Sequence, residues 1–544
     1  FFRRKTFFAN GRRVFARIDH GRLFCTKQKH KQVNFEGVLK ILKPHSGLLC
    51  IAFAGLGVSA AVTMALPAAF GYVIDNIEKK HSSEKRYKIF AGLGVMFLFG
   101  GLGVLTRIFF FNLASEKIIF SLRKKIMSNV LKKKIEFFEN VRSGDIVTRL
   151  NSDVVIMGKS FAGENLSSGA RKLVTLFGSF VLMIYISPKL TAATLVIPPL
   201  IFASSRIYGR LVKRITKLIQ KELGNSTSIA DESISNIQTV KIFNRQKFEN
   251  EKYKEAIERV FKASKKAITN SSIYSSAVNV VGNSVLLSIL VYGSHLCTIG
   301  EITVGTLTSF LFYSLYVGIS GMGLVRCYTD FMRGIGASTR VFELINGEDL
   351  RRTSLRPENP FKEKPFDITF EKIKFSYPSR MDNVILNRID LNFSHGKKYA
   401  IIGESGSGKS TIISLIIRFY RPLEGRILFG DKDINSLPAS TSRNSVGVVT
   451  QTLQFFSGTV LENLCYGIDG ECQSFKEMNE KYNAPVKVIE AAKTANAHYF
   501  IKLLPEQYHT KIGTNNALFS GGEKQRIAFA RALLCDPPVF LFDE

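Results

Sequence analysis

The sequence has few cysteines and few acidic residues for its 544 residues. Its seven cysteines include no Cys-x-x-Cys pair and no accompanying histidine spacing, so we expect reduced thiols rather than a metal site or a disulfide framework. Only 44 Asp and Glu oppose 75 Lys and Arg, which gives a formal net charge of +31. Such an excess favours either nucleic acid or a membrane face rich in anionic lipid as a partner.

The first 45 residues are rich in arginine and poor in acids, with twelve basic residues against Asp19 and Glu36. This composition is typical of an organelle transit peptide, particularly a mitochondrial one, and a disordered basic tail is the alternative. The chain begins at Phe1 instead of Met, so we expect a preceding segment. Residues 33–42, VNFEGVLKIL, predict either an amphipathic helix at the membrane interface or a plain linker.

Long uncharged runs occupy much of the first two thirds of the chain. About 20 apolar residues cross a bilayer as a helix. Six candidate spans meet or approach this length, and they comprise residues 46–74, 89–106, 173–188, 190–205, 267–300 and 302–325. Short turns at SPK and TIGEIT join the third span to the fourth and the fifth to the sixth.

Basic residues concentrate in the two long segments between spans. Residues 107–172 hold thirteen basic and six acidic side chains, and residues 206–266 hold fifteen and seven. With six spans, both segments face the same side as the N-terminus and the C-terminal region, as the positive-inside bias expects. The charge is therefore explained by contact with membrane lipid, and no nucleic-acid partner is predicted.

These long segments predict helices that continue beyond the bilayer and turn back, with a soluble insertion as the alternative. Ile118, Ile119, Leu122 and Ile126 recur at helical spacing and favour helix. Two pairs of polar residues lie inside the spans, Asn279 with Asn283 and Tyr313 with Tyr316. Each pair could line a substrate cavity or form hydrogen bonds between helices.

A soluble domain follows a polar linker, and it contains a glycine-rich loop. Alternation in FDITFEKIKFSY predicts a strand, and YAIIGESGSGKSTIISLIIRFY reads as a strand, a loop and a helix. Gly403, Gly408, Lys409 and Ser410 fit the P-loop pattern G-x-x-x-x-G-K-[ST]. Backbone N–H groups, the start of the helix and Lys409 would hold phosphate, and Ser410 would hold Mg²⁺.

The stretch VFLFDE at residues 539–544 predicts a buried strand in the same sheet as the strand before Gly403. Its end would bring Asp543 beside the phosphates to complete the Mg²⁺ site, and Glu544 would orient and deprotonate the attacking water. Upstream, Ser520, Gly521 and Gly522 open a predicted helix and form a second anion site. If one nucleotide cannot use both sites, the second serves the nucleotide of another chain.

These motifs together resemble an ATP-binding cassette (ABC) exporter of the type-B half-transporter kind, from about residue 33 onward. GESGSGKST resembles its Walker A motif, FLFDE its Walker B motif, and FSGGE its LSGGQ signature, with Phe519 for leucine and Glu523 for glutamine. SGDIVTRLNSD and ISNIQTVKIFNRQ resemble the segments that contain the coupling helices. GKSFAGENLSSGARK and TVGTLTSFLFYSLYVGIS are most similar to mitochondrial inner-membrane exporters, particularly the half-transporter associated with haem biosynthesis.

The resemblance implies a set of site residues. Gln451 in VVTQ matches the Q-loop, which contacts Mg²⁺ and senses nucleotide, and Tyr377 in FSYPSR matches the aromatic that stacks on adenine. Catalysis is assigned to Glu544, Gln451 and Lys409, and Mg²⁺ binding to Ser410, Gln451 and Asp543. Residues implied in ATP binding are Tyr377, Gly403, Ser405, Gly406, Gly408, Lys409, Ser410, Thr411, Gln451, Ser520, Gly521 and Gly522.

Two departures from the family pattern are visible. Glu523 places a negative charge near the incoming phosphate, and the family's D-loop and histidine switch, which follow the Walker B glutamate, are absent. A partial sequence is the simplest explanation, and a chain ending at Glu544 is expected to bind ATP weakly and hydrolyse it poorly.

The fold class expected is a six-helix membrane domain with long matrix or cytoplasmic extensions, followed by an α/β P-loop domain that is C-terminally incomplete. The expected domains are a leader (1–45), a transmembrane domain (46–340), a linker (341–365) and a cassette (366–544). The function expected is ATP-driven export by a homodimer in the mitochondrial inner membrane, cassette in the matrix, with a haem-related molecule or peptide as substrate. The alternatives are another cellular membrane, a nucleotide-binding regulatory or assembly protein, and a membrane-anchored P-loop NTPase of another class.

Overall fold

The computed structural model describes residues 35–78, 83–141, 143–195, 197–345, 361, 366–468, 478–479, 484–512 and 519–543. It divides into two compact units, residues 1–124 with 151–342 and residues 125–150 with 343–544. The basic leader up to residue 34, nearly all of the linker, and Glu544 lie outside the described residues.

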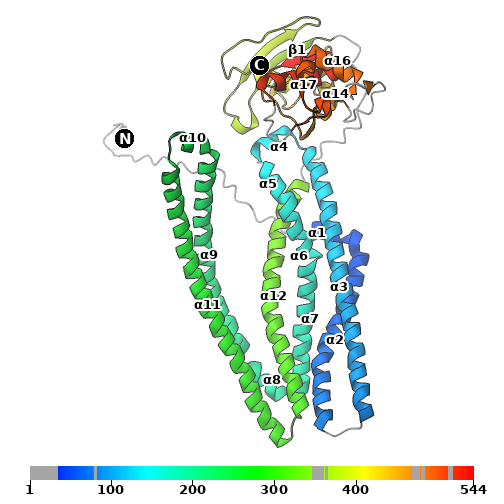
Figure 1. Cartoon of the computed structure of the whole chain (residues 1–544), viewed down its shortest axis with the longest axis vertical. Helices are drawn as coiled ribbons and strands as arrows, with labels where there is room; N and C mark the ends of the chain where they lie inside the picture. The colour runs from blue at the N-terminus through cyan, green and yellow to red at the C-terminus, as the bar shows by residue number, and fades with distance from the viewer. Residues whose placement is uncertain are drawn as a thin grey trace, which may run out of the picture. The chain divides into compact units, whose positions relative to one another are not determined.

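The first unit is helical (Figure 1). In chain order its elements, two of which run on into the second unit, are α1 (Phe35–Leu42), a 3₁₀ turn (Lys43–His45), α2 (Ser46–Glu78), α3 (Ser83–Leu131), a π-helical turn (Arg149–Asp153), α6 (Val154–Phe161), α7 (Glu164–Ile186), α8 (Pro188–Leu195), α9 (Ile197–Ser235), α10 (Ile237–Ile242), α11 (Gln246–Ile299) and α12 (Val304–Ile345). The helix predicted near residues 33–42 is thus present as α1.

Five helical stretches in the described part of the chain are long and apolar enough to span a bilayer, namely Gly37–Asn76, Tyr87–Leu131, Ser143–Ile186, Gln246–Ile299 and Val304–Ile345. They contain the first and second predicted spans and most of the third, fifth and sixth. The fourth predicted span, residues 190–205, is shared between α8 and α9 and passes through residue 196, which lies outside the described residues.

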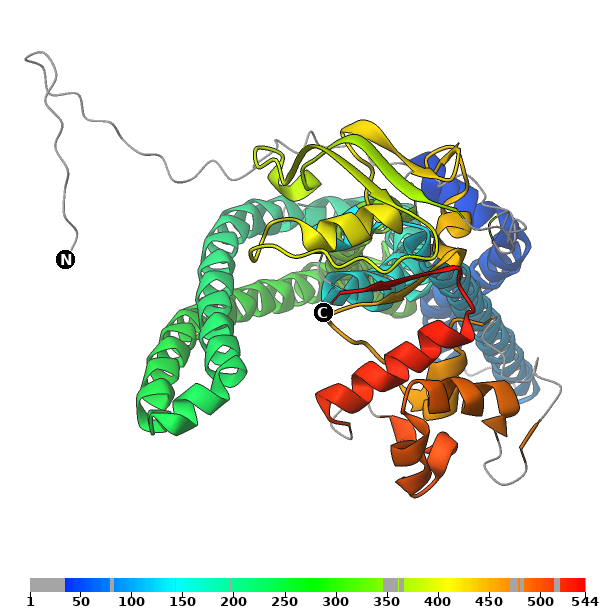
Figure 2. The same ribbon diagram turned by 90° about the horizontal axis from the view of Figure 1, so that it is seen from above.

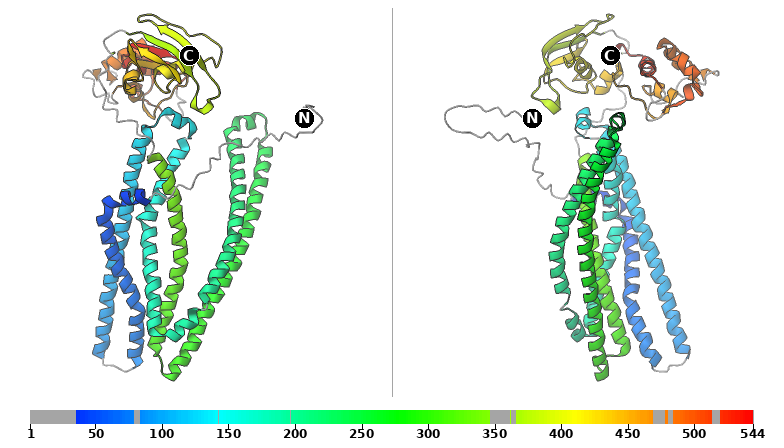
Figure 3. Two further views of the ribbon diagram at one scale, coloured as in Figure 1. Left: turned by 180° about the vertical axis from the view of Figure 1, so that it is seen from behind. Right: turned by 60° about the vertical axis from the view of Figure 1, so that its left-hand side comes forward.

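The prediction that span helices continue beyond the bilayer is confirmed. Helix α3 runs unbroken for 49 residues, and its Ile118, Ile119, Leu122 and Ile126 are buried. Helices α9 and α11 have 39 and 54 residues, about 58 and 81 Å at 1.5 Å per residue. They lie side by side along most of α9, joined by the short α10, in all the side views (Figures 1 and 3).

Small residues bring α2 and α12 close together. A Cβ atom added to Gly71 would lie 2.4 Å from the carbonyl oxygen of Gly305, so neither helix accommodates a larger residue there. The Tyr313 hydroxyl donates to the Met64 carbonyl oxygen at 2.7 Å, and the Asp75 carboxylate accepts from the Gly305 N–H at 2.8 Å. Tyr313 therefore joins two helices, as one of the two sequence interpretations proposed.

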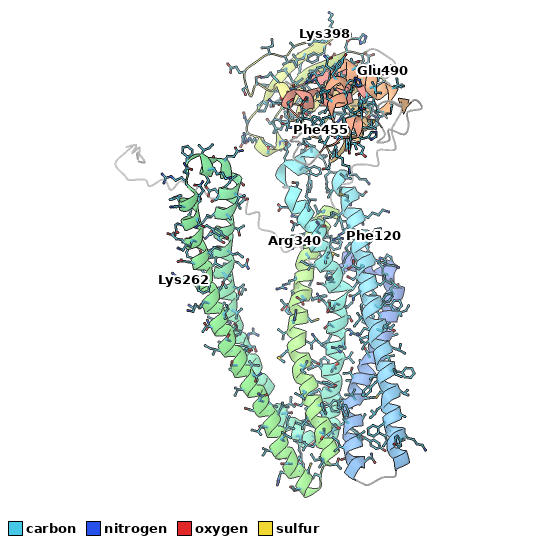
Figure 4. All side chains as sticks on the ribbon, viewed as in Figure 1. Phe120, Lys262, Arg340, Lys398, Phe455 and Glu490 are labelled. Atoms are coloured by element: carbon cyan, nitrogen blue, oxygen red, sulfur yellow. The ribbon has the colours of Figure 1, made fainter. Side chains whose placement is uncertain are left out.

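An ion pair between a half-exposed arginine and a buried aspartate joins α12 to the start of α6. The Arg340 guanidinium, labelled in Figure 4, donates to both carboxylate oxygens of Asp153 at 2.6 and 2.7 Å. Asp153 is 5% exposed, so the bidentate contact compensates a charge that has lost most of its water.

The second unit contains the cassette and the short helices α4 (Ile135–Asn140) and α5 (Ser143–Thr148). An antiparallel sheet has the order β2-β1-β3-β4, formed by Leu386–Phe393, Ile368–Phe375, Glu424–Phe429 and Lys432–Asp433. The predicted alternation around residues 366–377 is confirmed, because side chains of β1 alternate between buried and partly exposed over most of its length. Two further strands pair in parallel, β5 (Val446–Val449) and β10 (Val539–Phe542).

The cassette has two hydrophobic cores. One packs β1, β2 and β3 against α13 (Lys409–Ile416), and the other joins α15 (Val460–Cys465), α16 (Val486–Thr494), α17 (His498–Leu503) and α18 (Gly521–Leu534). The remaining elements are α14 (Ala439–Asn444), the 3₁₀ turns Pro378–Arg380 and Gln507–His509, and the two-residue strands β6 (Gly458–Thr459), β7 (Met478–Asn479), β8 (Ala484–Pro485) and β9 (Lys511–Ile512).

Three sequence expectations are wrong in this unit. Residues 399–402 form no strand, and Ile402 is 92% exposed, because no neighbouring strand pairs with them. Strand β10 pairs with β5 instead, and it is only partly buried, with Phe542 56% exposed. Cys465 is disulfide-bonded rather than reduced, whereas Cys50, Cys297 and Cys327 are free thiols.

Candidate functional site

The P-loop adopts a backbone that only glycine tolerates. Gly406 and Gly408 have φ angles of +85° and +97°, in the left-handed region. A Cβ atom on Gly408 would lie 2.8 Å from the Cδ2 atom of Leu386. Gly408 is the N-cap of α13, and no side chain caps this helix. The first N–H groups of α13 therefore remain as donors for an anion.

Lys409 and Ser410, the first residues of α13, point their polar atoms to different groups. The Lys409 ammonium donates to the carbonyl oxygens of Gly403 and Glu404, each at 2.8 Å. The Ser410 hydroxyl donates to Asp543 Oδ1 at 2.8 Å. The structure thus brings the serine of the P-loop and the aspartate after β10 together across 133 positions of sequence.

The position of Asp543 follows from the parallel pairing of β5 and β10. Residues 539–542 pair in register with residues 446–449, and the Asp543 N–H donates to the Val449 carbonyl oxygen at 3.0 Å. Gln451 follows β5 by two residues. Because parallel strands end at the same edge of a sheet, Gln451 and Asp543 leave this edge together.

The donor set at this edge suits Mg²⁺. Ser410 and Asp543 supply hard oxygen ligands in contact with each other, and Mg²⁺ is commonly held by one or two protein oxygens plus substrate phosphates. Among the described residues, no group of three or more His, Cys, Asp and Glu side chains is arranged to hold a metal ion. Phosphate oxygens and water would supply further ligands to a Mg²⁺ ion held here.

Tyr377 lies beside the P-loop helix. Its hydroxyl shares a hydrogen bond with Thr411 Oγ1 at 3.0 Å, and Thr411 is buried. The Tyr377 ring makes edge contacts with Phe375 and Tyr420, with centroids 5.1 and 5.2 Å apart. The predicted adenine-stacking residue is thus fixed to α13 by its hydroxyl and held by two rings.

Two residues near the site, Tyr420 and Glu139, belong to none of the motifs recognised in the sequence. The Tyr420 hydroxyl donates to Glu139 of α4, and burial raises the pKa of this tyrosine, with the hydrogen bond to Glu139 as the second cause. Tyr420 therefore joins α4 to the aromatic cluster that holds Tyr377. No motif spacing in the sequence indicates this contact, because the two residues are 281 positions apart.

Helix α18 starts with a capping box. The Glu523 N–H donates to Ser520 Oγ at 3.3 Å, while the Ser520 N–H and hydroxyl both donate to the Glu523 carboxylate at 2.8 Å. These bonds, first from the backbone N–H and then from the hydroxyl, lower the pKa of Glu523. From the sequence, Glu523 was interpreted only as an extra negative charge near the incoming phosphate. The S-x-x-E spacing would have identified it as a cap.

Gly521 and Gly522 are exposed, and the described part of the chain gives no packing reason for glycine at either position. A Cβ atom at either residue would meet nothing within 4 Å. Helix α18 leads directly into β10 (Figure 2). No hydrogen bond in the described structure joins Ser520, Gly521 or Gly522 to the P-loop. The structure therefore brings Lys409, Ser410, Thr411, Tyr377 and Asp543 together and leaves the α18 start as a separate exposed site.

Two protein families match this chain. The family described as ABC transporter transmembrane region matches residues 49–319, and the family described as ABC transporter matches residues 386–544. The first match ends within α12, and the second begins at the first residue of β2, before the P-loop.

Several known proteins are similar over most of the chain. It is 35% identical over 528 residues to the ABC multidrug transporter mdr2 of Aspergillus fumigatus, covering 94% of this chain and 64% of that protein. It is 32% identical over 514 residues to the ATP-dependent permease MDL1, mitochondrial, of Saccharomyces cerevisiae (92% and 72% covered). It is 33% identical over 518 residues to mouse ATP-binding cassette sub-family B member 10, mitochondrial (93% and 70% covered). The chain thus spans about two thirds of these relatives.

Proposed function

This chain belongs to the ABC transporter family, and from that premise we propose that the protein is a half-transporter that uses ATP hydrolysis to export a small molecule or peptide across a membrane. Family membership excludes the alternative of a P-loop NTPase of another class. The five apolar helices supply the membrane domain, and the P-loop unit supplies the nucleotide site.

In the proposed nucleotide site, Lys409 and the uncapped start of α13 hold the phosphates. Ser410, Asp543 and Gln451 hold Mg²⁺, and Tyr377 stacks on adenine. Bound ATP with Mg²⁺ supplies the phosphoanhydride bond whose hydrolysis drives the cycle. Glu544, one residue beyond Asp543, is proposed to orient the attacking water. Catalysis of this kind depends mainly on positioning and charge neutralisation.

The exposed start of α18 is the observation that carries the proposal of a dimer. An exposed helix N-terminus is formed by Ser520, Gly521 and Gly522. The space beside the two glycines is empty, and no contact within the described chain explains why larger residues are absent there. Since the P-loop already has its own phosphate-binding helix start, we propose that α18 of one copy caps the nucleotide of a second copy. The partner is therefore a second copy of this chain.

The membrane and the cargo are proposed from the relatives and from composition. Two relatives carry the word mitochondrial in their names, and the first 45 residues have the composition of a mitochondrial leader. We place the protein in the mitochondrial inner membrane with the cassette in the matrix. A haem-related molecule or a peptide is the proposed cargo.

Ser520→Ala tests the function directly. Loss of the hydroxyl should lower ATP hydrolysis about 100-fold, the order expected for one lost contact to the reacting phosphate, while ATP binding to the P-loop is kept. Thr459→Ala is the matched control, because Thr459 and Glu462 form the same capping box on α15. Both variants should lose about 1 kcal/mol of stability, but only Ser520→Ala should lose turnover.

Equal turnover in both variants would contradict the proposed role of α18. A second variant, Glu544→Gln, should trap a nucleotide-bound dimer that can be measured by nucleotide retention after gel filtration. Unchanged retention would favour the alternative in which the protein binds nucleotide for a regulatory or assembly role without transport.

A further inference from the structure

One face of α9 carries a continuous row of basic side chains. Its members are Arg206, Arg210, Lys213, Arg214, Lys217 and Lys221, and all six are exposed. Successive residues of an α-helix turn by about 100°, so these six fall within an arc of about 100°. They extend for about 22 Å along the helix at 1.5 Å per residue. We call this row the α9 basic face.

The opposite side of α9 packs against α11. The Tyr208 ring stacks on Tyr274 with centroids 4.0 Å apart, and Ile215 is 7% exposed. Glu222, farther along the same side, lies 3.5 Å from Arg259 of α11. Around the helix axis, these three residues point about 150° away from the centre of the row. The α9 basic face is therefore turned away from the helix that packs on α9.

None of the six cations has a partner in the described structure. No hydrogen bond or ion pair involves their side chains, and no acidic residue occurs between positions 206 and 221. Elsewhere in the same hairpin, basic residues are paired, as Lys252 is with Glu232 and Lys254 with Glu251. Stability of the hairpin thus does not require this row, and an unbalanced row of six charges produces a strong local positive potential.

We propose that the α9 basic face attracts a soluble anionic substrate from the matrix and guides it toward the spans. This rests on the proposed export function and deepens it, because it makes the cargo a molecule with several carboxylates or phosphates. Charges of one sign along a surface raise the association rate of an oppositely charged ligand by 10-fold or more, and salt weakens the effect.

The length of the row distinguishes a soluble anion from a lipid headgroup. The apolar segment ends at residue 205, so Arg206 and Arg210 are the residues at headgroup level. A headgroup layer is only about 5–8 Å deep, whereas the row extends about 22 Å along an unbroken helix. Lys213, Arg214, Lys217 and Lys221 lie beyond the reach of headgroups, so a ligand of these four residues is a soluble one.

The test uses the protein in nanodiscs and two fluorescent peptides, one rich in glutamate and one with every glutamate replaced by glutamine. Stopped-flow mixing measures their association rates at low and high salt. The acidic peptide should associate about 10-fold faster at low ionic strength, and the difference should shrink as salt rises. The variant K213Q/R214Q/K217Q should lose most of this difference while basal ATP hydrolysis stays unchanged.

The matched control is K262Q/K265Q/K266Q on α11. It removes the same number of exposed charges from the same hairpin, between the same two contacts, Tyr208 with Tyr274 and Glu222 with Arg259. Lys262 is labelled on α11 in Figure 4. This control should keep the preference for the acidic peptide. An equal loss in both variants would overturn the assignment to α9.

Three further results would overturn the proposal. If proteoliposomes of the wild-type protein take up both peptides equally in an ATP-dependent way, export stands and the preference for anions is wrong. If R206Q/R210Q is the only variant that changes the association rate, and only in discs that contain anionic phospholipid, the α9 basic face binds lipid. ATP-hydrolysing proteoliposomes that take up neither peptide would overturn this proposal and would exclude these peptides as cargo.

Discussion

Glu523 shows how a side chain's role depends on its local partners. As a bare charge it would repel an incoming phosphate. In the structure its carboxylate accepts the Ser520 N–H and hydroxyl, and these bonds lower its pKa, so it stays ionised and bound to the helix start at neutral pH. Glu523 therefore fixes Ser520 in place. Access of a phosphate to the Ser520 hydroxyl requires that hydroxyl to leave Glu523.

His498 is a second residue whose surroundings determine its chemistry. It is 5% exposed, and its Nδ1 atom shares a hydrogen bond of 2.9 Å with the Tyr508 hydroxyl. Burial lowers the pKa of His498, and the nearby Lys493 and Lys502 lower it further. The folded cassette thus favours the neutral imidazole.

This predicts acid sensitivity of the cassette. Above pH 6.5, the ordinary pKa of histidine, His498 is neutral in both the folded and the unfolded chain. Its protonation therefore does not reduce the free energy of unfolding in this range. Below pH 6.5 the unfolded chain binds a proton that the folded chain resists, so stability falls. Thermal unfolding should show a melting temperature that decreases from pH 6.5 to 5.5, and H498Q should flatten this slope. The exposed His395→Gln serves as control, and an equal slope in H498Q would contradict the prediction.

At the scale of elements, the contact between α2 and α12 depends on small residues. Gly71 faces Gly305, and Asp75 one turn farther along α2 accepts the Gly305 N–H and the Thr303 hydroxyl at the start of α12. Helices in membranes associate through such close backbone approach, since lipid offers no hydrophobic advantage to packing.

Gly71→Ala should therefore separate the two helices. The added Cβ would lie 2.1 Å from Ser309 Oγ and 2.4 Å from the Gly305 oxygen, and such overpacking costs about 1–3 kcal/mol. Gly57→Ala, on the same helix, meets nothing within 4 Å and should be neutral or stabilising. Thermal unfolding of the detergent-solubilised variants measures the difference. Equal melting temperatures would show that α2 and α12 tolerate a wider separation.

At the scale of the whole molecule, a proposed dimer has composite nucleotide sites, each with the P-loop of one copy and the α18 start of the other. Two differently tagged copies allow isolation of a defined heterodimer. A heterodimer of K409A with S520A keeps one intact composite site, because the intact P-loop of one copy meets the intact α18 of the other. A heterodimer of wild type with the double variant K409A/S520A keeps none.

The first heterodimer should retain up to about half of wild-type ATP hydrolysis, and the second should be inactive, if sites are shared between copies. Sites completed within a single chain would reverse this order, since only the wild-type copy of the second heterodimer would then work. Measuring both heterodimers side by side makes each the control for the other.

Patterns that repeat along the chain were predictable from the sequence. Uncharged runs indicated the spans, basic segments indicated the inner face, and glycine spacing indicated the P-loop, because membrane insertion and phosphate binding each impose a local rule on consecutive residues. The long helices α3, α9 and α11 were likewise predictable, because the segments between the spans are rich in residues that favour helix.

Contacts between distant segments were decided only by the tertiary structure. Pairing of β10 with β5 instead of residues 399–402, the Tyr420 contact with Glu139, and the packing of Gly71 on Gly305 join positions 93 to 281 residues apart in sequence, so no local pattern encodes them. The physical reason is that strand partners and helix contacts are selected by competition among all surfaces of the folded chain. The composition of one segment indicates the local structure and environment of that segment, and it does not identify the distant segment that packs against it.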